Sequence, residues 1–232
     1  MSWVTDLLFP PACVACARVL EAEGFFCAEC AQQVEPLPDE HCPRCAEPGE
    51  FPPGRVCQRC TERPPPFVRA FAPFTHGGAI ARAIHELKYE DHPELARPLG
   101  TLLAKEARAF LDALPVRAVV AAIPLHRRRL EQRRYDQAEL LAVELAGRTG
   151  RRHLVALERT KATQRQVGLS EAARDANVSG AFAARAEVAG EDVLLVDDVF
   201  TTGATARAAA GALKAAGAAS VHVLTLARAF TL

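Results

Sequence analysis

The stretch of this chain that best suits chemistry joins two adjacent carboxylates, Asp197 and Asp198, to a turn rich in hydroxyl groups. The turn consists of Thr201, Thr202, Gly203, Ala204 and Thr205. A glycine lets the backbone close round an anion without a Cβ in the way, and hydroxyl groups and backbone amides donate hydrogen bonds to it. Carboxylates repel an anion, so they need sugar hydroxyls or a metal cation as partners. A ribose that carries a 5′-phosphate satisfies both halves of the stretch.

The neighbouring residues predict the elements that hold this stretch. Residues 193–196 form an apolar run typical of a buried parallel strand, and the Ala-rich residues 206–216 predict a helix that stops at Gly217. In open α/β sheets, ligands bind beyond the carboxyl ends of the strands, where the amino end of a helix favours a phosphate. The alternative is a strand followed by an acidic helix cap, which explains one aspartate but neither the second nor the Thr-Thr-Gly sequence.

The cysteines of the chain fall into a second chemical pattern. All eight lie within residues 13–60 as the Cys-x-x-Cys pairs Cys13/Cys16, Cys27/Cys30, Cys42/Cys45 and Cys57/Cys60. Two such pairs can close a tetrahedron of sulfurs about Zn²⁺, so we expect two structural zinc ions bound by sequential pairs. The alternatives are disulfides, which a reducing compartment disfavours, and redox Cys-x-x-Cys motifs, which call for one motif beside a βαβ unit.

The proline-rich residues 63–66 predict a linker between a Cys-rich domain, residues 1–62, and a main domain, residues 67–232. Further strands are expected at residues 67–75, 116–123 and 221–228. The strands alternate with helical patterns, which favours an α/β fold with a mostly parallel sheet, preceded by a small Cys-rich domain.

Basic side chains follow the strand predicted at residues 116–123. They are His126, Arg127, Arg128 and Arg129. A basic loop at the carboxyl end of a central strand lies on the same rim as the aspartate pair, where it can neutralise a pyrophosphate. A solvated turn or a nucleic-acid patch are the alternatives.

Another cation, Lys88, comes with Tyr89 at the end of an amphipathic helical pattern. Its ammonium group either reaches the phosphates or lies at a solvated helix end. The formal net charge of the chain is zero, yet residues 126–165 hold eleven basic and five acidic side chains, whereas residues 1–62 hold four basic and ten acidic ones. The basic segment is therefore a candidate anion-binding surface.

No stretch approaches the roughly 18 apolar residues that a membrane span requires, and the amino terminus lacks a basic segment followed by an apolar run. We therefore expect no membrane insertion and a cytoplasmic location, where the thiols stay reduced and available for metal.

The run Val-Asp-Asp-Val-x-Thr-Thr-Gly-x-Thr at residues 196–205 resembles the ribose-phosphate loop of type I phosphoribosyltransferases. These Rossmann-like enzymes bind 5-phosphoribosyl-1-pyrophosphate (PRPP) together with Mg²⁺. The resemblance implies a catalytic and ribose-binding role for Asp197 and Asp198, phosphate binding by residues 201–205, and pyrophosphate binding by residues 126–129. Residues 159–182 look like the mobile loop that covers bound PRPP.

The order of motifs along nearly the whole chain resembles the ComF family, which joins a double zinc ribbon to a phosphoribosyltransferase-like domain and is associated with DNA uptake in competent bacteria. The motifs are the cysteine pairs, Leu-Lys-Tyr at 87–89, Pro-Leu-His-Arg-Arg-Arg at 124–129, Arg-x-Tyr-Asp-Gln-Ala at 133–138 and Thr-x-x-Gln-x-x-Leu at 163–169. One departure is Arg134-Tyr135-Asp136-Gln137, where the family commonly has Gly-Phe-Asn-Gln, so Arg134 and Asp136 add charges to that turn.

Two functions follow from these motifs. The first is an enzyme in which an unidentified acceptor displaces pyrophosphate at ribose C1. The second is a non-catalytic, PRPP-sensing module that binds single-stranded DNA, with DNA-uptake proteins as partners and a homodimer left open. Arginines supply phosphate contacts, but one Trp and two Tyr offer few stacking platforms for bases.

Overall fold

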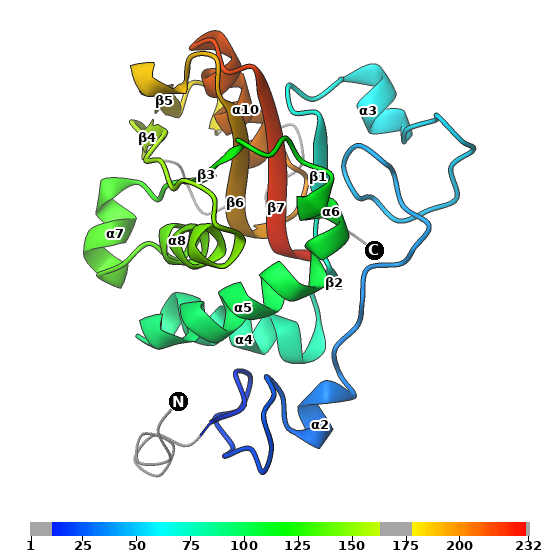
Figure 1. Ribbon diagram of the computed structural model, residues 1–232, viewed down its shortest axis with the longest axis vertical. Helices are drawn as coiled ribbons and strands as arrows, with labels where there is room; N and C mark the ends of the chain where they lie inside the picture. Colours follow the sequence, from blue (N-terminus) through cyan, green and yellow to red (C-terminus); the bar gives the residue numbers. More distant parts are fainter. Residues whose placement is uncertain (1–10, 163–177, 231–232) are drawn as a thin grey trace.

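The computed structural model describes residues 11–162 and 178–230, and its centre is a parallel sheet in the order β1-β7-β6-β3 (Figure 1). The strands are β1 (Arg69–Phe71), β3 (Val119–Ala122), β6 (Asp192–Phe200) and β7 (Ser220–Arg228), and β2 (Phe74–Thr75) pairs with the end of β7 beyond β1. Every pairing in this sheet is parallel. The predicted α/β fold with a parallel sheet is confirmed.

Helices cover both faces of the sheet, because its central strands are apolar on both sides. The first face packs against α4 (Gly78–Tyr89), α5 (Ala96–Glu106) and α8 (Gln137–Thr149), and the second face packs against α10 (Ala204–Ala215). Side chains alternate along β6, so that Leu194 and Val196 join the first core and Val193 and Leu195 the second.

Shorter elements connect these layers. They are α2 (Ala28–Ala31), α3 (Gln58–Glu62), η1 (Pro93–Leu95), α6 (Arg108–Asp112), α7 (Arg127–Arg133), β4 (Leu157–Arg159), β5 (Phe182–Ala184) and η2 (Ala186–Val188). Strands β4 and β5 form a separate antiparallel pair. Most of the predicted mobile loop, residues 163–177, lies outside the described residues. No helix in the described part of the chain is both long and apolar enough to cross a membrane.

The Cys-rich segment forms a first ribbon, residues 13–30, and a second ribbon, residues 42–60, which pack on different faces of the main domain. Helix α2 of the first ribbon lies against α4 (Figure 1). Gly78 permits this contact, because its φ is 48° and an added Cβ would lie 2.2 Å from the carbonyl oxygen of Gln33. The cysteines of the second ribbon join the core on the α10 side. The proposed division at residues 63–66 stays a prediction.

Three predicted boundaries were wrong. Strand β6 does not stop before the aspartates but runs to Phe200, because β7 continues beside it and pairs Thr225 with Asp197. Residues 127–129 form the first turn of helix α7 rather than a loop, since the His126 side chain caps that helix. Helix α10 begins at Ala204 instead of residue 206.

Candidate functional site

A cavity of about 200 Å³ opens beyond the carboxyl ends of β3 and β6, where the sequence placed the ligand. Its polar lining includes two carboxylates, Asp197 and Asp198, and the hydroxyl groups of Thr201, Thr205 and Thr225. The basic side chains of its lining are Lys88, Arg129, Arg133 and Arg159. The cavity therefore combines a cation-binding group, hydroxyl donors and a basic wall.

Asp198 is the most fully engaged acidic group of the cavity. The Lys88 Nζ atom lies 2.7 Å from its Oδ1 atom, and the Gln137 side chain donates a hydrogen bond of 2.9 Å to its Oδ2 atom. Only 5% of Asp198 is exposed, so water contributes little to its solvation. The end of α4, the start of α8 and strand β6 thus converge on one carboxylate.

Asp197 lies in a different electrostatic environment. It accepts a hydrogen bond of 2.8 Å from the backbone N–H of Asp198, and alternation along β6 turns its side chain toward the α10 face. Burial, reinforced by the charge of Asp198 and opposed by Lys88, raises the pKa of Asp197 to about 8. The carboxyl group therefore holds a proton near neutral pH, and a bound cation would favour the ionised form instead.

The turn from Thr201 to Thr205 brings backbone close to the cavity at the amino end of α10. Gly203 caps the helix with a φ of 77°, and an added Cβ would lie 2.5 Å from the Phe200 ring, so only glycine fits. Thr202 and Ala204 are buried, and the Thr202 hydroxyl accepts the Ala204 N–H at 3.4 Å. These two residues shape the turn, whereas the side chains of Thr201 and Thr205 line the cavity.

Of the four side chains predicted to hold pyrophosphate, the structure brings Arg129 to the cavity wall. His126 accepts the Arg128 N–H at 3.2 Å through Nδ1 and so caps α7. Arg127 points to solvent, with its Nε 2.9 Å from Glu131. Within the described part of the chain, His126, Arg127 and Arg128 lie outside the cavity lining.

Two basic residues of the wall, Arg133 and Arg159, were not assigned to pyrophosphate from the sequence. The Arg133 guanidinium stacks 4.7 Å from the centre of the Tyr89 ring and donates to Gln137 Oε1 at 3.0 Å. Arg159 lies in β4 over the Phe182 ring, and burial together with nearby Arg129 lowers its pKa. Arg133 belongs to the Arg-x-Tyr-Asp-Gln-Ala motif, but that motif does not indicate a pyrophosphate contact, because α7 and β4 reach the same cavity only in the folded chain.

The turn at residues 134–137, which differs from the Gly-Phe-Asn-Gln pattern, connects three parts of the site. The Tyr135 hydroxyl donates to the Leu87 carbonyl at 2.6 Å, next to Lys88. Asp136 caps α8 by accepting the Ala138 N–H at 3.0 Å, and its other oxygen accepts the Leu125 N–H at 2.6 Å. Burial raises the pKa of Asp136, and these backbone donors oppose that shift. The aspartate thus fixes the β3 loop relative to α8.

Arg134 and Gln137 complete this turn. Arg134 follows α7 with a left-handed φ of 66°, a conformation that suits the glycine of the family pattern, and pairs with Asp91 at 3.1 Å. Gln137 opens α8 and contacts Asp198. Gln137 was assigned no role from the sequence beyond its place in the motif, although its position directly after the helix cap Asp136 could have marked it.

Both cysteine clusters fit zinc. Within each sequential set of four cysteines, all Sγ atoms lie within 4.8 Å of one another, with 3.8 Å between Cys16 and Cys27 and 3.5 Å between Cys45 and Cys57. A tetrahedral ion with Zn–S bonds of about 2.3 Å holds its sulfurs about 3.8 Å apart. All eight thiols are free of disulfides. The chain therefore has two Cys₄ zinc-binding sites, paired as the sequence predicts.

Comparisons with known proteins agree with both halves of the chain. Residues 4–61 match the double zinc ribbon domain, and residues 140–230 match the phosphoribosyl transferase domain. The DNA utilization protein YhgH of Escherichia coli (strain K12) is 32% identical over 226 residues, which cover 93% of this chain and 89% of that protein. A structure of glutamine PRPP amidotransferase from B. subtilis aligns with 55% of this chain and 25% of its own chain at 28% identity, with a TM-score of 0.38.

Two relatives carry competence names. Competence protein F of Haemophilus influenzae is 32% identical over 152 residues, which cover 63% of this chain and 66% of that protein. Competence protein ComFC of Bacillus subtilis is 29% identical over 160 residues, which cover 67% and 62% respectively. With both domains matched and most of its length aligned to a relative, the chain belongs to the ComF family, which joins a double zinc ribbon to a phosphoribosyltransferase domain.

Proposed function

We propose that the cavity binds PRPP together with Mg²⁺. The observation that carries this proposal is the convergence, at the carboxyl ends of parallel strands, of a Thr-Gly-x-Thr turn, an aspartate pair and a basic wall. The turn at the amino end of α10 would bind the 5′-phosphate through N–H and hydroxyl donors. Asp197 and Asp198 would accept hydrogen bonds from the ribose hydroxyls, and Arg129 with its basic neighbours would hold pyrophosphate.

The chemistry we propose is displacement of pyrophosphate at ribose C1 by an acceptor. Mg²⁺ would neutralise pyrophosphate as it leaves. The protein's part is electrostatic: the arginines stabilise the departing anion, while the carboxylates stabilise positive charge that develops on the ribose ring. Asp197 can take this role once a nearby cation, such as the Mg²⁺ that accompanies PRPP, shifts its carboxyl group to the ionised form.

Thermal unfolding tests whether PRPP is the ligand of the cavity. PRPP with Mg²⁺ should raise the unfolding temperature in a concentration-dependent way, as ligands that bind only the folded state do. Ribose 5-phosphate should give a smaller rise because it lacks pyrophosphate. Release of pyrophosphate, assayed against nucleobases and oligonucleotides, then separates an enzyme from a sensor. A protein that shows no thermal response to PRPP at millimolar concentration contradicts the proposed ligand.

The second candidate function is binding of single-stranded DNA, which is compatible with the name of one relative, DNA utilization protein. Arg127 and Arg128 are exposed on α7 beside the cavity, where a DNA backbone can reach them. PRPP should compete with DNA if the two anions share Arg129. A cytoplasmic location fits free thiols that bind zinc, and a homodimer stays a prediction.

A further inference from the structure

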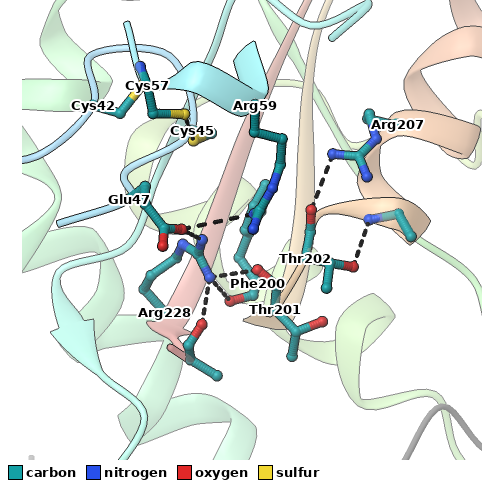
Figure 2. Close-up of polar contacts among 12 residues, drawn as sticks. Cys42, Cys45, Glu47, Cys57, Arg59, Phe200, Thr201, Thr202, Arg207 and Arg228 are labelled. Carbon is teal, nitrogen blue, oxygen red and sulfur yellow. Dashed lines mark hydrogen bonds and ion pairs between the residues drawn. The ribbon is translucent and has the colours of Figure 1, made fainter. Parts of the chain in front are cut away.

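Arg228, the last residue of β7, holds a buried guanidinium group and is not among the residues that line the cavity. Figure 2 shows its polar contacts. Only 1% of the residue is exposed. Its Nη1 atom donates to the carbonyl oxygens of Phe200, at 3.1 Å, and of Thr201 and Ala229. The guanidinium also stacks 5.0 Å from the centre of the Phe200 ring. Arg228 therefore fixes the backbone at the point where β6 ends and the phosphate turn begins.

The turn is held from its other end as well. Arg207 of α10 donates to the carbonyl oxygen of Thr202 at 3.0 Å (Figure 2). The carbonyl groups of Thr201 and Thr202 thus both accept from arginines, and because the C=O and N–H of a trans peptide point in opposite directions, the N–H groups of Thr202 and Gly203 point away from those arginines. A shift of Arg228 would change this geometry, although among the residues that line the cavity its recorded contacts are with the Phe200 ring and the carbonyl oxygens of Phe200 and Thr201.

Glu47 of the second ribbon supplies the countercharge. Its carboxylate pairs with Arg228 Nη2, and Arg59 Nη1 lies 3.8 Å from the same oxygen (Figure 2). The Glu47 carbonyl accepts the N–H of Cys42 at 2.7 Å, so its backbone belongs to the Cys42–Cys45 turn that holds zinc. The position of this carboxylate is therefore tied to the cysteine turn that would ligate zinc.

The pairing matters because Arg228 is a buried charge. Burial lowers the pKa of Arg228, and the charge of Glu47 opposes that shift. A buried ion that loses its partner is strongly destabilised, so the guanidinium would rearrange if Glu47 moved away. The first ribbon offers no equivalent contact in the described residues, because it packs on α4, where Arg82 donates to Gln33 and Cys30.

We propose that Glu47 and Arg228 are positioning residues that couple the second zinc site to the phosphate turn. Loss of zinc from the second ribbon would then weaken phosphate binding at a cavity whose lining, among the residues described, comes entirely from the main domain. The inference rests on the proposed PRPP function and adds a zinc-dependent control of the same site.

The test is the affinity of the full-length, zinc-loaded protein for ribose 5-phosphate and for pyrophosphate, measured for wild type and Glu47→Gln. Ribose 5-phosphate uses the turn, whereas pyrophosphate uses the basic wall. Coupling free energies between sites typically correspond to about 5- to 150-fold, so Glu47→Gln should weaken ribose 5-phosphate by at least about fivefold and leave pyrophosphate unchanged. The matched control is Glu29→Gln, which removes an exposed partner of Arg18 in the first ribbon and should change neither affinity.

Zinc provides an independent readout, because coupling is reciprocal. Ribose 5-phosphate should tighten zinc binding at the second site of wild type by the factor by which zinc at that site tightens ribose 5-phosphate binding. This effect should vanish in Glu47→Gln. Equal loss of both ligands in Glu47→Gln, or no loss of either, overturns the coupling. If wild type binds neither PRPP nor ribose 5-phosphate, the proposed function itself fails, and that outcome is distinct from a failed coupling.

Discussion

The ion pair between Lys88 and Asp198 permits a quantitative prediction. The Lys88 side chain is 19% exposed and that of Asp198 7%, with 2.7 Å between the charged atoms. Replacing Lys88 with Met keeps the apolar stem but leaves a buried carboxylate whose remaining partner is Gln137. Removal of one partner from a buried pair costs about 3–5 kcal/mol. At about 2–4 °C per kcal/mol for a domain of this size, the unfolding temperature should fall by roughly 6–20 °C.

The assay is thermal unfolding of wild type, Lys88→Met, Asp198→Asn and the double variant. In the double variant the uncompensated charge is gone, so most of the lost stability should return. Lys105→Met is the matched control, because Lys105 is 71% exposed and pairs with Glu106 at 3.4 Å, which makes the expected loss less than about 1 kcal/mol. Equal effects of Lys88→Met and Lys105→Met, or additive losses in the double variant, would refute the reasoning.

Three further predictions concern metal, pH and DNA. Metal analysis should find about two Zn²⁺ per chain, and chelation should unfold residues 13–60 while the main domain keeps its circular-dichroism signal; absence of zinc contradicts this. The pKa of Asp197 is about 8 in the folded chain, compared with 3.8 for an unperturbed aspartate, so the free energy of unfolding should fall as the pH rises from 4 to 8. Asp197→Asn should remove most of that pH dependence, and parallel pH profiles of wild type and variant would argue against it. If α7 tracks a DNA backbone, affinity for single-stranded oligonucleotides should decrease with salt, and replacing Arg133 and Arg134 with Ala should reduce the log-log slope by about one to two units; salt-independent binding excludes that interface.

Local patterns predicted the parts of the molecule whose geometry is set locally. The spacing of the cysteines predicted both Cys₄ sites, since a Cys-x-x-Cys turn places its own two sulfurs together. The apolar run at residues 193–196 predicted the central strand, and Gly203 marked a turn that a Cβ would block. The assignments of individual residues to PRPP remain predictions, although the structure gathers Asp197 and Asp198 with the turn.

The parts that were missed depend on contacts between distant segments. Asp198 meets Lys88 and Gln137 only after three elements pack together, and no local pattern encodes that meeting. Strand β6 continues through two aspartates, which are poor strand formers, because β7 supplies a hydrogen-bonding partner. The buried charge of Arg228 is likewise paired with Glu47, which lies in the second ribbon, far away in the sequence.

Calorimetric titration of the protein with PRPP in the presence of Mg²⁺ tests whether the cavity is a PRPP site. We expect saturable binding of one PRPP per chain in wild type. Thr205→Val removes a hydroxyl donor to a charged phosphate, which costs about 1.5–3 kcal/mol, or roughly 10- to 150-fold in affinity. Thr101→Val, on α5 and away from the cavity, should bind as wild type does. No binding heat, or wild-type affinity in Thr205→Val, would contradict the claim that this cavity is a PRPP site.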